Sequence, residues 1–333
     1  MYRKWVFTAA CLTFLVVVVG AYVRLQDAGL GCPDWPGCYG HLVGVPQSAE
    51  EISRAEQGFP QRPVEGHKAW KEMFHRYLAG VLGVLLFALM IAAWRRRVLL
   101  AQSPWLPTAI VALVAVQAAL GMWTVTLVLK PAIVTLHLLG GMATLTLTCW
   151  LALRQLAWPP SPMAAHRLRP WARLGLLILF CQIALGGWVS TNYAALVCRD
   201  FPACHGAWMP DMDFGHGFHL FRELGVTAAG APLSLAALTA IHWTHRIGAL
   251  VTFLYLGALA IGLMRSAGYW RMGAMLALLL AVQVSLGVAN VVMTLPLPVA
   301  VAHNGGAAAL LVMMVVINFA LSRTGSTNST NPR

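Results

Sequence analysis

The sequence predicts an all-α polytopic membrane protein whose eight transmembrane helices form two tandem four-helix bundles related by pseudo-two-fold symmetry. Three observations predict this fold: the composition, eight apolar runs of membrane-spanning length, and an internal duplication. Of the 333 residues, 59% are hydrophobic and only 10% are charged, whereas soluble domains are about one quarter charged. The composition therefore excludes an ordinary soluble enzyme, a disordered chain and a disulfide-rich secreted scaffold.

The apolar runs set the positions of the helices. A helix needs about 20 mostly apolar residues to cross a bilayer. The expected spans are roughly 5–24, 73–94, 106–127, 132–153, 172–192, 239–264, 270–293 and 299–321. No convincing small-residue cleavage site follows the first run, so we expect an uncleaved span rather than a signal peptide.

The charges predict the orientation. All eleven acidic residues lie in 27–72, in 200–213 and at Glu223, on one side of the predicted membrane, whereas thirteen of the 23 basic residues fall on the other side. The positive-inside rule makes the basic side cytoplasmic, and both termini with it. The net charge of +12 therefore indicates topology and contact with anionic membrane lipid, and we expect no nucleic-acid partner.

The duplication is visible at a constant offset. Shifting the sequence by 166 residues aligns Cys32 and Cys38 with Cys198 and Cys204, and His137 with His303; a shift of 170 aligns His75-Arg76 with His245-Arg246. A repeat of four spans keeps its orientation in the membrane, which predicts an axis along the membrane normal. The expected parts are an N-terminal half (1–157), a cytoplasmic linker (158–171), a C-terminal half (172–322) and a polar tail (323–333).

Four histidines repeat in pairs, His75 with His137 and His245 with His303, each near the outer end of a span. Facing histidines on two helices of a bundle can ligate heme iron from both sides. A single such histidine would more often hydrogen-bond a neighbouring helix, but recurrence across a duplication favours ligation. Zinc is a weaker alternative, because no third protein ligand is evident in each half.

Arg76 and Arg246 each directly follow a candidate ligand. A guanidinium at the membrane boundary suits a heme propionate, because it pairs with carboxylates in a bidentate way. The alternative is that each arginine only extends its charge to the interface.

Glu72 distinguishes the two halves. It lies three residues before His75, on the same helical face, whereas His242 occupies the equivalent position in the second half. A carboxylate beside an apolar pocket can move protons, which predicts that one half performs chemistry while the other holds a permanent cofactor. The alternative is that Glu72, at a helix start, caps the helix or complements its dipole.

The cysteine pairs Cys32/Cys38 and Cys198/Cys204 share a Cys-x5-Cys spacing in the outer loops. An oxidising compartment favours a disulfide within each pair; a redox role and a joint metal site are the alternatives. A Gln-x2-Leu-Gly pattern, which begins at Gln117, Gln182 and Gln283, is interpreted as helix packing.

These features together carry a family resemblance. They are the eight spans in two halves, Glu72-x2-His75-Arg76, His137, His245-Arg246, His303 and one outer cysteine pair in each half. The combination resembles the bacterial heme A synthases of the CtaA type, over essentially the whole chain to about Arg323. The resemblance implies an oxidoreductase of the bacterial inner membrane that oxidises the C8 methyl of heme O to a formyl group by successive hydroxylations. The heme A product is used in cytochrome oxidase assembly.

The resemblance also implies roles for individual residues. His245 and His303 would be axial ligands to the iron of a resident heme B, whereas His75 and His137 would receive heme O, with Glu72 as the catalytic carboxylate. It links the pair Cys32–Cys38 to activity and gives Cys198–Cys204 a more structural role.

The expected partners are heme O as substrate, heme O synthase as its supplier, and an electron acceptor whose identity the sequence leaves open, as it does the oligomeric state. Two other functions fit the histidine pattern. A bis-His diheme electron carrier would hold two permanent hemes of equal standing, and a heme chaperone would release its heme unmodified.

Overall fold

The computed structural model describes residues 1–159 and 163–323, and in them eight helices are long and apolar enough to cross a membrane. These helices are α1 (Tyr2–Leu25), α3 (Gly66–Arg95), α5 (Trp105–Thr126), α6 (Pro131–Leu153), α7 (Arg169–Thr191), α9 (Leu235–Met264), α10 (Trp270–Val292) and α11 (Leu297–Ser322). The shorter elements are α2 (Ala49–Gly58), α4 (Arg97–Leu100), η1 (Met163–Leu168), η2 (Ala194–Leu196) and α8 (Phe214–Gly217). The predicted all-helical membrane fold is confirmed.

Two helices begin earlier than the apolar runs predict. Helix α3 starts at Gly66 rather than at 73, and α9 starts at Leu235 rather than at 239. The first two turns of α3 are polar, so an apolar window does not register them as helix. Ser234 caps α9, because its side chain accepts a hydrogen bond from the Ala237 amide. Each helix has 30 residues, about 45 Å at 1.5 Å per residue, and so is longer than the hydrocarbon core of a bilayer.

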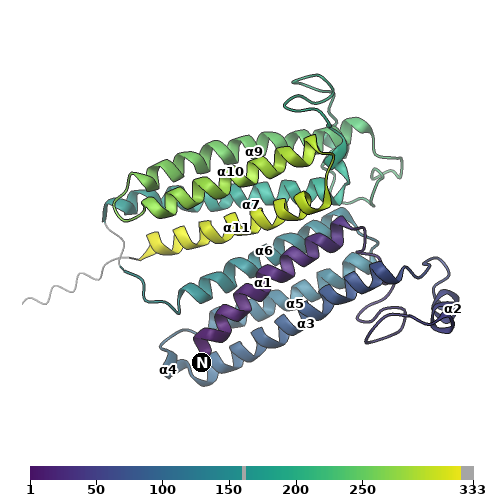
Figure 1. Cartoon of the computed structure of the whole chain (residues 1–333), viewed down its shortest axis with the longest axis horizontal. Helices are drawn as coiled ribbons and strands as arrows, with labels where there is room; N and C mark the ends of the chain where they lie inside the picture. The colour runs from purple at the N-terminus through teal and green to yellow at the C-terminus, as the bar shows by residue number, and fades with distance from the viewer. Residues whose placement is uncertain (160–162, 324–333) are drawn as a thin grey trace, which may run out of the picture.

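The long helices form two groups of four (Figure 1). Close packing runs from α1 to α3, α5, α6 and back to α1 in the first group, and from α7 to α9, α10, α11 and back to α7 in the second. The order of contacts is the same in both groups, and the pseudo-two-fold axis itself stays a prediction. The groups meet where α6 packs on α7 and α11, and where α1 packs on α11.

The largest hydrophobic core is shared by the two groups. Met142 and Leu145 of α6 belong to the same buried cluster as Leu256 of α9 and Met314 of α11. Helix α11 lies at the junction and is the most buried of the spans. The two halves are therefore packed against each other and not merely tethered.

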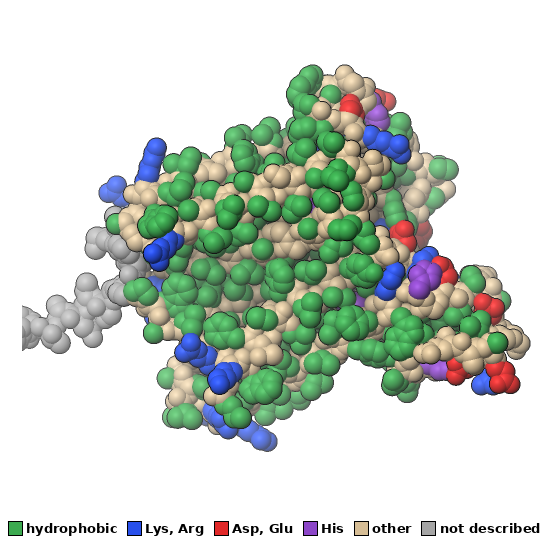
Figure 2. Space-filling model, viewed as in Figure 1, with side chains coloured by type: hydrophobic (Ala, Val, Ile, Leu, Met, Phe, Trp, Pro, Cys, Tyr) green, Lys and Arg blue, Asp and Glu red, His purple; other side chains and the backbone are tan. Residues whose placement is uncertain are grey.

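Charge divides the molecule along the helix axes. Figure 2 shows hydrophobic side chains over the middle of the helices, Lys and Arg at both ends, and acidic side chains only at the end away from the start of α1. This distribution suits a multi-pass membrane protein. Residues 163–168 form η1 and α7 begins at Arg169, so the end of the predicted linker is helical. Residues 160–162 of that linker and 324–333 of the predicted tail lie outside the described residues.

Candidate functional site

The four histidines lie at opposite corners of the two helix groups. His75 is on α3 and His137 on α6, while His245 is on α9 and His303 on α11. In each group the two histidine-bearing helices are separated by the other two, because close packing runs around the group rather than across it. This placement directs both histidines of a pair to the middle of a four-helix group, where cofactor sites of helix bundles are built.

A glycine of the neighbouring helix makes room for each imidazole. A Cβ atom on this glycine would lie 2.9–3.4 Å from Cε1 of the ring, closer than side chains ordinarily pack. The pairs are Gly20 with His75, Gly121 with His137, Gly186 with His245, and Gly287 with His303. Each imidazole therefore lies directly against the backbone of the neighbouring helix, at a glycine that has no side chain.

A cavity of about 610 Å³ lies in the second half, and His245 and His303 both line it. Its size is within the ~300–1,000 Å³ typical of ligand and cofactor sites. The lining is mostly apolar and is supplied mainly by α7, α9, α10 and α11, with Arg24 of α1 and Arg246 of α9 as basic groups. Arg24 comes from the other half of the chain, and sequence reasoning missed it because Ser190 stands at the duplicated position.

The imidazoles have nitrogen atoms available to a ligand. Nδ1 of His75, of His137 and of His303 is buried without a hydrogen-bond partner among the described residues. A buried polar atom without a partner is costly, and coordination of a metal is one way to satisfy an imidazole nitrogen. Of these, His303 lines the apolar cavity of the second half together with His245, and this histidine pair fits a bis-His heme.

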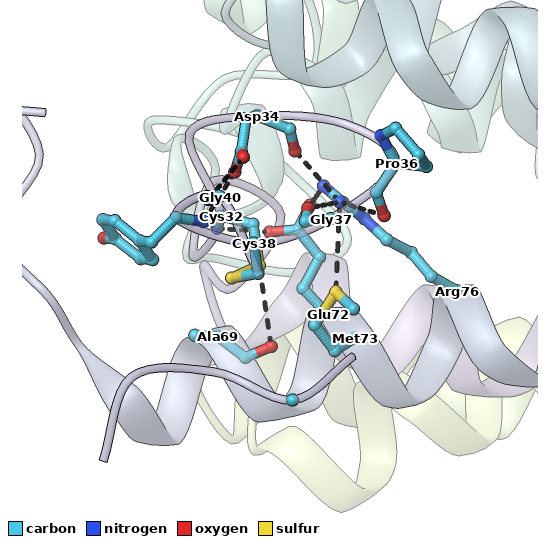
Figure 3. The surroundings of a disulfide bond; sticks show 12 residues. Cys32, Asp34, Pro36, Gly37, Cys38, Gly40, Ala69, Glu72, Met73 and Arg76 are labelled. Carbon is cyan, nitrogen blue, oxygen red and sulfur yellow. Dashed lines mark hydrogen bonds and ion pairs between the residues drawn. A yellow bond between two sulfur atoms is a disulfide. The ribbon is translucent and has the colours of Figure 1, made fainter. Parts of the chain in front are cut away.

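Glu72 and Arg76 form an ion pair beneath the first cysteine loop (Figure 3). Arg76 Nη2 lies 2.5 Å from Glu72 Oε1, and Glu72 Oε2 accepts a hydrogen bond from the Cys32 amide at 3.0 Å. Arg76 Nη1 also donates to the carbonyl oxygens of Asp34 and Gly37. The carboxylate thus links α3 to the disulfide loop.

Glu72 does not cap a helix. Helix α3 begins at Gly66 with Glu65 as its N-cap residue, so Glu72 lies in the second turn, where the first-turn amides are out of reach. The alternative that its role is to cap the helix is wrong. Its side chain is only 6% exposed, which separates it from the solvated acids of the outer loops.

The second half repeats this arrangement without a carboxylate. Arg246 donates from Nη2 to the Cys198 carbonyl at 2.6 Å and from Nη1 to the Asp200 and Ala203 carbonyls. Its Nε lies 3.3 Å from Nε2 of His242, the counterpart of Glu72. Both arginines therefore hold cysteine loops in place. Their predicted contact with propionates stays a prediction, and it has a structural basis in Arg246, which also lines the cavity.

The two cysteine loops are closed by disulfides, Cys32–Cys38 and Cys198–Cys204. In the second loop the Asp200 carboxylate accepts hydrogen bonds from the His205 and Gly206 amides at 2.9 and 2.8 Å. These amides, that of Gly206 first, lower the pKa of Asp200 below its usual 3.8. The carboxylate thus stays charged and stabilises the turn.

The outer ends of the halves are joined by polar contacts. Arg24 Nη1 donates to the Tyr193 hydroxyl at 2.7 Å, and Arg24 Nη2 donates to the Ser190 carbonyl at 2.8 Å. The Tyr193 hydroxyl in turn donates to Asp27 at 2.9 Å. Ser190 and Tyr193 are the duplicated counterparts of Arg24 and Asp27 at the offset of 166, so equivalent positions of the two halves meet here.

The glutamines interpreted as packing residues contact the histidines. Gln182 Nε2 lies 3.0 Å from Nδ1 of His245, and Gln283 Nε2 lies 3.5 Å from a ring nitrogen of His303. The sequence held only the spacing, because each glutamine lies four residues before a glycine; the structure shows that this glycine faces a histidine.

Comparison with known proteins places the chain in a family. The sequence profile of the family COX15-CtaA, described as cytochrome oxidase assembly protein, matches residues 3–315. A protein named heme A synthase from Shewanella oneidensis is 45% identical over 320 residues, which cover 95% of this chain and 96% of that protein. Proteins of the same name from Caulobacter vibrioides and Caulobacter sp. strain K31 are 29% and 30% identical, with 92% or more of each chain covered. This chain belongs to the COX15-CtaA family of cytochrome oxidase assembly proteins.

Proposed function

We propose that this protein is a heme A synthase, a membrane oxidoreductase that converts the C8 methyl of heme O to the formyl group of heme A by successive hydroxylations. The observation that carries the proposal is the 45% identity to a heme A synthase over 95% of the chain. Two histidine pairs, an apolar cavity and one asymmetric carboxylate support it.

The second half suits a resident heme B. His245 and His303 line the cavity and would be the two axial ligands. Arg246 and Arg24, which also line it, would pair with the propionates. When bound, such a heme supplies one-electron transfer. The protein contributes the ligands, the basic groups and an apolar wall that keeps water away.

The first half suits the substrate. His75 and His137 would ligate heme O, with Arg76 near its propionates. Glu72 is the one buried carboxylate in the described residues, and it lies one helical turn from His75. Arg76 stabilises the charged form of Glu72, and an oxygen of this carboxylate can accept a proton from the reacting centre to give the neutral acid. His242 replaces this group in the second half, so we assign the chemistry to the first.

The proposed setting is the bacterial inner membrane with both termini in the cytoplasm. Heme O would be supplied by heme O synthase, and an electron acceptor would complete the oxidation. Arginines at the proposed cytoplasmic end would contact anionic lipid headgroups.

The test is to extract hemes from membranes of a host that makes heme O but lacks its own heme A synthase, with and without this protein, and to separate them by mass-resolved chromatography. We expect heme A or its hydroxylated precursor only with the protein. Glu72→Ala should retain heme but form little product. Glu65→Ala, at the N-cap position of the same helix, is the matched control and should stay active. A protein that purifies with heme B and leaves heme O unchanged, even with added oxidants, would instead indicate an electron carrier.

A further inference from the structure

Glutamines hold both histidines of the second half from neighbouring helices. Gln182 on α7 places Nε2 3.0 Å from both Nδ1 and the carbonyl oxygen of His245. Gln283 on α10 places Nε2 3.0 Å from the carbonyl oxygen of His303 and 3.5 Å from the ring atom Nε2 of the same histidine. In both cases the amide nitrogen donates to the carbonyl oxygen of the histidine, which fixes the stretch of helix that carries the imidazole.

Glycines at fixed spacing make these contacts possible. A Cβ atom at Gly248 or Gly306, three residues after each histidine, would overlap the amide of Gln182 or Gln283. The glycine four residues after each glutamine lies against the imidazole, as described above. A Gln-x3-Gly segment on one helix therefore interlocks with a His-x2-Gly segment on the next.

The first half has this arrangement at one histidine only. Gln117, Gly121, His137 and Gly140 repeat the pattern between α5 and α6, and a Cβ at Gly140 would overlap the Gln117 amide. The amide of Gln117 and Nδ1 of His137 are both buried without a hydrogen-bond partner. The glutamine is thus in place beside an imidazole that still has bonding capacity.

His75 is the exception. It lies against Gly20 of α1 as the other histidines lie against their glycines. At the glutamine position four residues before Gly20 the chain has Val16, and at the glycine position three residues after His75 it has Leu78. Nothing on α1 or α3 therefore replaces the glutamine contact, and Nδ1 of His75 is buried without a partner.

We propose that Gln182 and Gln283 are positioning residues that fix the imidazoles of His245 and His303, and that the missing glutamine at His75 makes the first half the exchangeable heme site. The inference rests on the proposed heme function and gives a structural reason why one of the two duplicated sites would keep its heme while the other exchanges it. Groups that hydrogen-bond a metal-ligating histidine orient its ring, and their loss typically costs 10–100-fold in affinity. A permanent cofactor benefits from two fixed ligands, whereas a substrate that must leave benefits from one free ligand.

The test is the rate at which heme passes from the purified full-length protein to excess apomyoglobin. A His137→Ala background confines the measurement to the second half. In it, Gln182→Leu and Gln283→Leu should each raise the rate of heme loss about 10–100-fold and shift the low-spin ferric electron paramagnetic resonance signal. Gln182→Glu should not restore retention, because a carboxylate cannot donate to the ring or to the carbonyl oxygen of His245. Gln102→Leu is the matched control, because Gln102 bonds Gln155 and lies outside the cavity lining.

The reverse change tests the first half. In a His245→Ala background, Val16→Gln with Leu78→Gly should slow heme loss about tenfold or more. Rates within twofold of the parent in both leucine variants, with an unchanged bis-His signal, would overturn the inference and leave the proposed function intact. Persistence of both low-spin hemes in the His245→Ala protein would instead refute the proposed ligands.

Discussion

Removal of the Glu72 carboxylate should loosen the first disulfide loop while leaving the second unchanged. In Glu72→Ala the amide of Cys32 loses its acceptor, and Arg76 loses its only acidic partner in the described residues. A hydrogen bond to a buried charged group contributes about 1.5–3 kcal/mol. Loss of a buried ion-pair partner costs about 3–5 kcal/mol, but Arg76 keeps the carbonyls of Asp34 and Gly37, which reduces the cost.

We therefore expect the free energy of opening this loop to fall by about 2 kcal/mol, which corresponds to about 30-fold faster reduction of Cys32–Cys38 if reduction requires local opening. The assay reduces the folded protein with a water-soluble phosphine and quantifies the released thiols by isotope-coded alkylation and mass spectrometry. Cys198–Cys204 in the same molecule is the internal reference, because Arg246 holds its loop without a carboxylate.

Glu65→Ala is the control variant, because its ion pair with Lys68 is partly exposed to solvent and such surface pairs contribute little. An unchanged ratio of the two reduction rates in Glu72→Ala would refute the reasoning, and so would equal acceleration of both disulfides. In Glu72→His, which copies His242, we expect a smaller acceleration, because the imidazole can still accept from Arg76.

Two further predictions concern the second loop and the junction of the halves. Because the folded-state pKa of Asp200 is lowered, its stabilising contribution is present above its ordinary pKa of 3.8 and is lost as pH falls through the lower folded value. The protection of the Gly206 amide against hydrogen exchange, relative to its intrinsic rate at each pH, should therefore fall in acid. Asp200→Asn should show low protection at neutral pH and no such acid step; a step that persists in this variant would assign it to another group. Tyr193→Phe removes the hydroxyl that accepts from Arg24 and donates to Asp27, so it should destabilise the protein by about 1–2 kcal/mol and lower Tm by about 2–4 °C for each kcal/mol. A Tm within 1 °C of the parent protein, measured in the same detergent, would contradict this estimate.

The spans were predictable because hydrophobicity and charge are local properties of the chain. The eight apolar runs, the separation of acidic from basic residues and the repeat at 166 are all visible in one dimension. The start of α3 was missed because its first two turns are polar and carry no apolar signature. That error hid the position of Glu72 in the second turn of α3.

By itself the sequence determined the membrane class, the expected orientation and the repetition of His75, His137, His245 and His303. Only the tertiary structure decided which groups meet, because side-chain partners depend on how helices far apart in the chain pack their faces together. It placed histidine-bearing helices at opposite corners and brought Arg24 to the cavity of the other half. It also brought two of the three apparent packing glutamines, Gln182 and Gln283, into contact with imidazoles, which requires two helix faces to interlock.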